Sequence, residues 1–562
     1  MIAGAGNIGA GDPSFLLINE ASGVINASGT TALVIDNDSP ATDNFAINEI
    51  VNSGTIEATG SGGLTIENTT IDNSTFNPSD NSGVDGHIEV FAGSQINLDN
   101  ATILQGFVST AAGGEIATVS GSSNEIETAN GSTHNTNVAT IINAGTIAVS
   151  DNSSLALASP YNIENSGTIE LNSTGDKTIL YFNQPYPILS GGGDIILEGG
   201  SGSQDIIAGM TGQGFTTVHL ENQNDTISGA GAIGQNDGAL TLQNDADGII
   251  NANLNGQTLT VEPGGAVTND GLMEATNGGI LAIDPTTVTN TSTIEATADS
   301  FVMIEGDTVT NYAVAGDITV NGTIEAVGTD AIVALFGATI VGGILETSDG
   351  GTIGVTSGIN TFESVAVTGG SFIQTNDGAT VDLQGTTTLG GTVTFEGGGT
   401  FTLDGDGAEI VGAADTNATL DNLGLITGAG QIGTGDDLLT LVNGCGDGVN
   451  TINADVDGKA RTINTGTNAI INNGLLEATR GGELGIKSAL INSNEVFASS
   501  HSETRSRTEH AARSRRRITA RSRSMTLASI TAGRSRRTAT ALSSNSPTRR
   551  SPAARWPRAG MA

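Results

Sequence analysis

A glutamate returns at the same place of a short motif throughout the chain, and carboxylates are among the groups on which acid–base catalysis depends. With small variations the motif reads Gly-Thr/Leu-hydrophobic-Glu-Ala, and its glutamates are Glu57, Glu170, Glu274, Glu295, Glu325 and Glu477. A catalytic pair of carboxylates occurs once, with a separation suited to its two roles. Because this glutamate recurs, we interpret it as the outward-facing residue of a repeated strand, and we predict no catalytic residues.

Acidic corners are the candidate metal ligands. Asp404-Gly-Asp-Gly407, Asn244-Asp-Ala-Asp-Gly248 and Asp436-Asp437 offer the carboxylate oxygens that Ca²⁺ prefers. They lack the spacing of an EF-hand loop and of the Gly-Gly-x-Gly-x-Asp repeats of calcium-binding β-rolls. We therefore predict solvated corners, no cofactor and no defined metal site, with weak Ca²⁺ binding by the acidic chain as a whole.

Other catalytic groups are scattered along the first 500 residues. The histidines there are His87, His134 and His219, and no Ser-His-Asp set, metal-binding His pair or phosphate-binding loop can be assembled at a known spacing. We predict that the protein is not an enzyme. A polysaccharide-degrading β-helix enzyme is the remaining catalytic alternative, although such enzymes generally need a basic residue near metal-bound carboxylates.

The best candidate for ligand contact is the stretch Tyr181-Phe-Asn-Gln-Pro-Tyr-Pro187, which interrupts the repeat. Aromatic residues make up only 3 % of the chain, and Tyr181, Phe182 and Tyr186 gather here. Aromatic rings in a loop can stack on sugars, or they can close a corner by packing. A glycan- or calcium-binding module is therefore the alternative to a purely structural role.

The elements that carry these residues are short strands. In Asn52-Ser-Gly-Thr-Ile-Glu-Ala-Thr59 and its copies, apolar and polar side chains alternate with a period of two, and Gly, Asn, Asp and Ser separate the runs. The copies recur every 21 or 22 residues, as from Gly322 to Gly343. This period favours a parallel β-helix over an array of β-sandwiches, which repeat at about 100 residues.

Such a β-helix would have about two dozen coils and a length of about 110 Å, at about 4.8 Å per coil. The asparagines that lead the motif, Asn52, Asn143, Asn165 and Asn269, are expected to stack into a hydrogen-bonded amide ladder.

A longer repeat contains the short one. Ile2-Ala-Gly-Ala-Gly-Asn-Ile8 returns as Ile227-Ser-Gly-Ala-Gly-Ala-Ile233 and as Ile426-Thr-Gly-Ala-Gly-Gln-Ile432. We predict three solenoid modules, the third of them partial, followed by a tail. Their ranges are 1–226, 227–425, 426–499 and 500–562.

Charge separates the body from the tail. Residues 1–500 hold five basic and 58 acidic side chains, whereas residues 501–562 hold 15 arginines and two glutamates. A body this acidic repels phosphate, so we expect it to bind no nucleic acid. We interpret the disordered Arg/Ser-rich tail as out-of-frame translation of the repeat, with a genuine basic arm for nucleic acid or an anionic surface as the alternative.

The motif copies alternate with Gly-Gly-x-Leu/Ile-x-Ile segments such as Gly62-Gly-Leu-Thr-Ile66 and Gly481-Gly-Glu-Leu-Gly-Ile486. Over residues 1–499 this pattern resembles the large repetitive surface proteins of Gram-negative bacteria, namely autotransporter passenger domains and filamentous-haemagglutinin-like adhesins. The resemblance implies a right-handed parallel β-helix that forms a monomeric stalk, at the cell surface or secreted, for adhesion or biofilm contact. Its partners would be a host or neighbouring cell surface, with glycans as candidate ligands.

Two segments that an exported protein of this kind usually carries are missing from the sequence. There is no signal peptide after Met1, and no apolar run is long enough for a transmembrane helix. We therefore expect the export signal and the anchor to lie outside this chain, which we interpret as a fragment.

Overall fold

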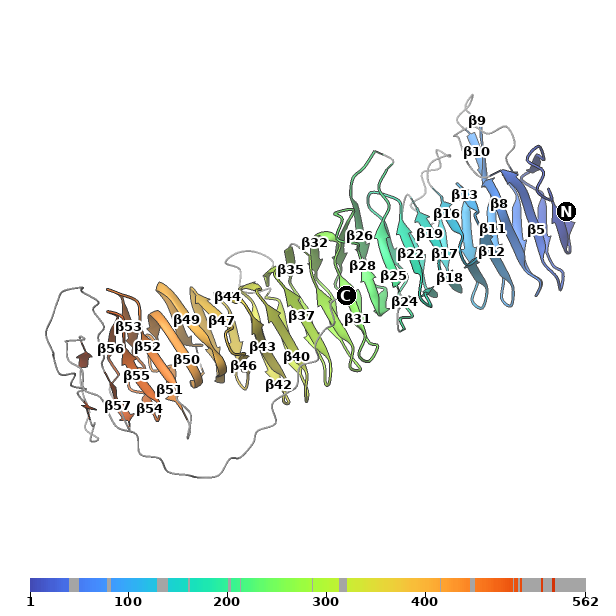
Figure 1. The fold of residues 1–562 in the computed structure, drawn as a ribbon. Helices are drawn as coiled ribbons and strands as arrows, with labels where there is room; N and C mark the ends of the chain where they lie inside the picture. The colour runs from blue at the N-terminus through green and yellow to red at the C-terminus, as the bar shows by residue number, and fades with distance from the viewer. Residues whose placement is uncertain are drawn as a thin grey trace, which may run out of the picture.

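The computed structural model describes most of the chain up to residue 497. The described ranges are 1–39, 50–77, 82–128, 140–159, 162–200, 204–212, 214–285, 287–312, 321–414, 416–444, 450–488, 490–493, 496–497, 517–518 and 528–530. Within these ranges the regular elements are β-strands and none is an α-helix, and they stack into one long rod with the N-terminus at one end (Figure 1). No helix that could cross a membrane occurs in the part of the chain described.

Each turn of the rod contains three strands, and through most of the rod a strand pairs in parallel with the strand three places further on. In the middle of the rod, β33 (Leu272–Ala275) pairs with β36 (Thr293–Ala296), which pairs with β39 (Thr323–Val327). The other two faces of that turn are β34 (Ile280–Ile283) and β35 (Thr287–Asn290). The predicted parallel β-solenoid is therefore confirmed.

The period-two alternation decides which side chains form the core. Met273, Ile294 and Ile324 lie in register on one face, and each is at most 1 % exposed. The residue after each of them points outward, because successive side chains of a strand alternate between its two sides. Burial of this kind repeats in every turn, so the hydrophobic core is a continuous line along the rod.

Close approach between turns explains the Gly-Gly pair that follows the motif. A Cβ atom on Gly279 would lie 2.0 Å from the carbonyl oxygen of Ala252 in the preceding turn. Asn277 and Gly278 have φ angles of 54° and 80°, in the left-handed region that Asn and Gly tolerate best. The corner therefore needs this composition to bring the next strand into register.

The number of turns is about 18, fewer than the two dozen predicted. His87 pairs with Phe107, 20 residues on, but Val108 pairs with Ile141, 33 residues on. The described turns therefore differ in length, and the longer ones spread the chain over fewer turns than a uniform period of 21 would give. At about 4.8 Å per turn the solenoid is roughly 85 Å long, shorter than the predicted 110 Å.

The three copies of the long repeat have equivalent neighbours. Gly6 pairs with Leu33, Gly231 with Leu259, and Gly430 with Arg461. The strands that carry these pairs are β2 (Gly6–Ile8), β5 (Leu33–Ser39), β28 (Gly231–Ile233), β31 (Thr258–Val261), β50 (Ala418–Ile432) and β53 (Ala460–Ile463).

The predicted tail, residues 500–562, lies outside the described residues except for β59 (Arg517–Ile518) and β60 (Ala528–Ile530). His134 also lies outside them.

Candidate functional site

Inside the solenoid the motif asparagines form the predicted amide ladder. The side-chain amide of Asn222 donates to Oδ1 of Asn244 at 2.9 Å, Asn244 donates to Asn269 at 2.9 Å, and Asn269 donates to Asn290 at 2.8 Å. Asn290 continues the row to Asn311 at 2.6 Å. These five side chains are fully buried. Because each amide both donates and accepts, the row satisfies buried polar groups from turn to turn.

The other predicted ladder residues take the same role elsewhere. Asn52 receives a hydrogen bond from Asn19 at 2.7 Å and donates to Asn73 at 2.6 Å, and Asn143 donates to Asn165 at 2.8 Å. The ladder prediction is therefore confirmed for Asn52, Asn143, Asn165 and Asn269. A ligand-binding role for these buried amides is excluded by their burial.

An aspartate replaces an amide where the ladder is interrupted. In the turn after Asn165, Gly191 follows Ser190, the partner of Glu164, and so takes the ladder position, and the carboxylate of Asp225 bonds to Asn165 instead. Asp225 accepts hydrogen bonds from the amides of Gly192 and Gly193, at 2.9 and 3.1 Å, and from Asn165 at 3.3 Å. Burial raises the pKa of Asp225, and these three donors oppose that rise. An anion is tolerated here because backbone and side-chain donors surround it.

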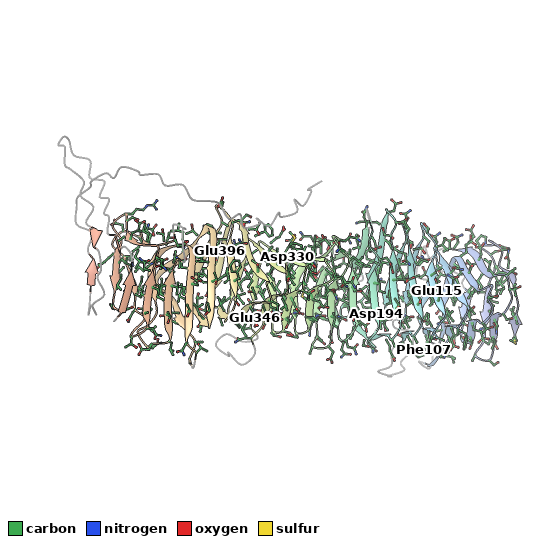
Figure 2. The ribbon with its side chains drawn as sticks, turned by 90° about the horizontal axis from the view of Figure 1, so that it is seen from below. Phe107, Glu115, Asp194, Asp330, Glu346 and Glu396 are labelled. Atoms are coloured by element: carbon green, nitrogen blue, oxygen red, sulfur yellow. The ribbon has the colours of Figure 1, made fainter. Side chains whose placement is uncertain are left out.

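On the outside of the rod the motif glutamates form an acidic row. Glu274, Glu295, Glu325 and Glu346 occupy paired positions in four successive turns, and Glu346 is labelled in Figure 2. Partial burial raises the pKa of Glu274, Glu295 and Glu325, and a neighbouring glutamate adds to the rise for Glu274 and Glu325. The predicted outward orientation is confirmed for the motif glutamates.

The aromatic segment is only partly at the surface. Tyr186 is 72 % exposed, and its ring stacks on that of His219 with the centroids 5.0 Å apart. Tyr181 is half-buried on β22 (Lys177–Phe182) between Ala156 and Ala208 of the neighbouring turns. Phe182 was predicted as a ligand contact, and this is wrong, because alternation along β22 turns its ring into the core, where it is fully buried. Tyr181 and Tyr186 keep surface positions.

Acidic corners close turns of the rod. Asp436 accepts hydrogen bonds from the hydroxyl of Thr434 at 2.7 Å and from the amide of Leu438 at 3.0 Å, and these bonds lower its pKa. Asp404 accepts one from the side-chain Nε2 of Gln384 at 3.3 Å. Among the described residues no group of three or more His, Cys, Asp or Glu side chains could hold a metal ion.

A hollow of about 410 Å³ lies on the outer surface where β25 (Gln204–Gly209), β28 and β31 stack. Its lining includes Gly200, Gln204, Ile206, Ala232, Gln257 and Thr258. The sequence did not predict it, because among the residues just named only Ala232 belongs to a motif, the second copy of the long repeat, and a small residue there does not by itself indicate a ligand. The only signal is the run of glycines and serines that begins at Gly199.

Two buried ionisable side chains also escaped the sequence analysis. Asp307 is 4 % exposed, and its Oδ2 atom has no hydrogen-bond partner among the described residues. Burial raises the pKa of Asp307 to about 7, with Asp284 and Glu305 adding to the rise. Arg461 is fully buried at a core position of β53. The strand pattern predicts neither residue, because Asp307 occupies a position that suits an amide side chain and Arg461 occupies one that suits an aliphatic side chain.

The raised pKa of Asp307 makes stability depend on pH. As pH rises from about 4 to 7, the unfolded carboxyl loses its proton before the folded one, so the native protein loses stability over this range and stays less stable above it. At pH 8 we expect Asp307→Asn to stabilise the surrounding turns by about 2 to 4 kcal/mol, and at pH 4 to change little. An asparagine fits this corner, because Asn360 occupies the equivalent position two turns on.

Thermal unfolding followed by circular dichroism between pH 4 and 8 measures this effect. Asp330→Asn is the matched control, since Asp330 is an exposed turn residue, labelled in Figure 2. A stabilisation by Asp307→Asn that is equal at pH 4 and pH 8 would contradict a raised pKa of Asp307 in the folded protein.

Comparison with known proteins does not identify a family for this chain. No protein-family model matches the chain, and no curated protein matches it significantly.

Proposed function

We propose that this chain is a non-enzymatic stalk or adhesin segment of a large bacterial surface or secreted protein, and that it mediates adhesion or biofilm contact with a host or neighbouring cell. The observation that carries the proposal is the continuity of the rod's interior. The aliphatic core passes from turn to turn along the rod, and the amide ladder joins successive turns in several runs, the longest from Asn222 to Asn311. Directional hydrogen bonds combined with close packing oppose bending, as a stalk requires.

The outer surface supports the same role. Acidic side chains lie along the whole rod, and Glu115, Asp194, Asp330 and Glu396 mark its course in Figure 2. A net charge of −40 keeps an extended protein soluble and discourages lateral association of its open faces. The rod therefore suits a spacer that carries contacts away from the surface to which it is attached.

Rod length can be changed by one deletion. Removing residues 227–425 joins Thr226 to Ile426, where the long repeat begins again. Ile227 and Ile426 have equivalent partners in the following turn, Ile250 and Ile452. We expect the variant to fold and to be shorter by about nine turns, or about 40 Å. Small-angle X-ray scattering measures the length, and aggregation or loss of the β-strand signal would show that the modules are not interchangeable.

Adhesion is tested by displaying the chain on a non-adherent laboratory bacterium. We expect several-fold more cells to be retained on an epithelial monolayer or on plastic than for undisplayed cells, and fewer for the deletion variant at equal display. Antibody staining controls for display level. Retention no greater than that of undisplayed cells would refute an adhesive role, while a straight rod of the expected length would still support a spacer.

A further inference from the structure

The surface hollow at β25, β28 and β31 belongs to the second copy of the long repeat. Ala232 lines it, and the equivalent residues are Asn7 in the first copy and Gln431 in the third. The small alanine thus leaves space that longer side chains would occupy. Gly199 forms an edge of the hollow, and a Cβ there would lie 2.7 Å from Cδ1 of Leu254 and 3.2 Å from Oε1 of Gln257. Both atoms are the ends of flexible side chains, and Gly199 has a φ angle of 64°, in the left-handed region that glycine favours.

Buried polar contacts hold the edge in place. The carboxylate of Asp205 is fully buried and accepts hydrogen bonds from the amide of Gly199 at 3.2 Å and from that of Ser173 at 2.9 Å. The amide of Gly200 donates to Oε1 of Gln257 at 2.7 Å. That bond orients the side chain of Gln257, whose NH₂ group has no bond to another described residue and can donate to a ligand. These hydrogen bonds therefore fix the shape of the hollow.

The lining indicates an uncharged ligand with both apolar and hydroxyl faces. Ile206 and Ala232 supply apolar surface, whereas Gln204, Gln257 and Thr258 supply neutral hydrogen-bonding groups. Asp205 is engaged by backbone amides, and the ammonium of Lys177 bonds to Gln235 at 3.0 Å without lining the hollow. A phosphate would therefore find no cation here, and a metal ion would find no cluster of carboxylates.

We propose that this hollow is a binding subsite for one neutral sugar ring at the end of a glycan or polysaccharide chain. A pyranose has C–H groups that can contact Ile206 and Ala232, and hydroxyls that amide side chains can bind. The volume lies at the lower end of the range for ligand sites, which suits one ring. Binding through so few groups would be weak, in the millimolar range. The subsite goes beyond a stalk role and does not depend on it.

Saturation-transfer NMR of the full chain with free glucose, galactose, mannose and N-acetylglucosamine tests the proposal. We expect transfer to at least one of these sugars and at least tenfold weaker binding in Ala232→Phe, whose ring fills the hollow, and in Gln257→Ala. Gln431→Phe is the matched control, because it places the same ring at the equivalent position of the third copy.

Three results would overturn the subsite. They are the absence of saturation transfer from the unmodified chain to any of the four sugars, transfer that survives Ala232→Phe, and equal loss in Gln431→Phe. Circular dichroism of each variant establishes that it is folded. None of these substitutions alters rod length, so a negative result leaves the stalk proposal standing.

Discussion

Replacing Asn269 with aspartate should open the turns around it. The amide of Asn269 donates to Oδ1 of Asn290 at 2.8 Å and to the carbonyl oxygen of Thr293 at 3.0 Å. A carboxylate would present negative oxygen atoms to both acceptors inside a fully buried site. We expect a loss of about 3 to 5 kcal/mol at neutral pH, the range found when a buried charge lacks a partner. At acid pH a protonated aspartate recovers one donor, so part of the stability should return.

Hydrogen exchange of the backbone amides in β32 (Gly264–Asn269) and β35 measures the loss, because solenoids open locally and neighbouring turns respond first. The matched control is Asn255→Asp at an exposed corner, which adds the same charge. Equal protection in the two variants would mean that the ladder contributes little. Asp225 supports the expectation that a buried aspartate needs hydrogen-bond donors, because three donors surround its carboxylate.

Replacing Arg461 with leucine should have the opposite effect and stabilise the rod. The guanidinium donates to the carbonyl oxygens of Ile426 and Thr427, but its Nε atom has no partner among the described residues. Burial lowers the pKa of Arg461 to about 9, against a smaller opposing effect of Asp455. Exchange of a buried charge for a packed aliphatic side chain commonly stabilises by about 1 to 4 kcal/mol.

A leucine fits the position of Arg461, because Leu33 and Leu259 occupy the equivalent positions in the other two copies of the long repeat. We expect Arg461→Leu to raise the unfolding temperature and to slow amide exchange in β53. The reciprocal change Leu259→Arg should destabilise the second copy. Faster exchange in Arg461→Leu would indicate that the two carbonyl contacts outweigh the cost of burying the charge.

Local rules explain what could be predicted. Alternation with a period of two places Met273 inside and Glu274 outside, whatever the rest of the chain does. A polar residue that recurs once per turn must stack on its copies, so the ladder through Asn269 follows from the period alone. The error on Phe182 arose at the interrupted turn, where clustered aromatics suggested a surface loop although the strand alternation continued through them.

The sequence by itself determined the parallel solenoid, the outward glutamates and the amide ladder, because each depends only on residues one turn apart. The number of turns follows only from the tertiary structure, because the spacing between motif copies does not reveal whether the extra residues between them form another turn. The tertiary structure also decided which irregular residues became special. Arg461 and Asp307 are buried, and Ala232 borders a hollow, through the side chains of the turns above and below, which no single motif encodes.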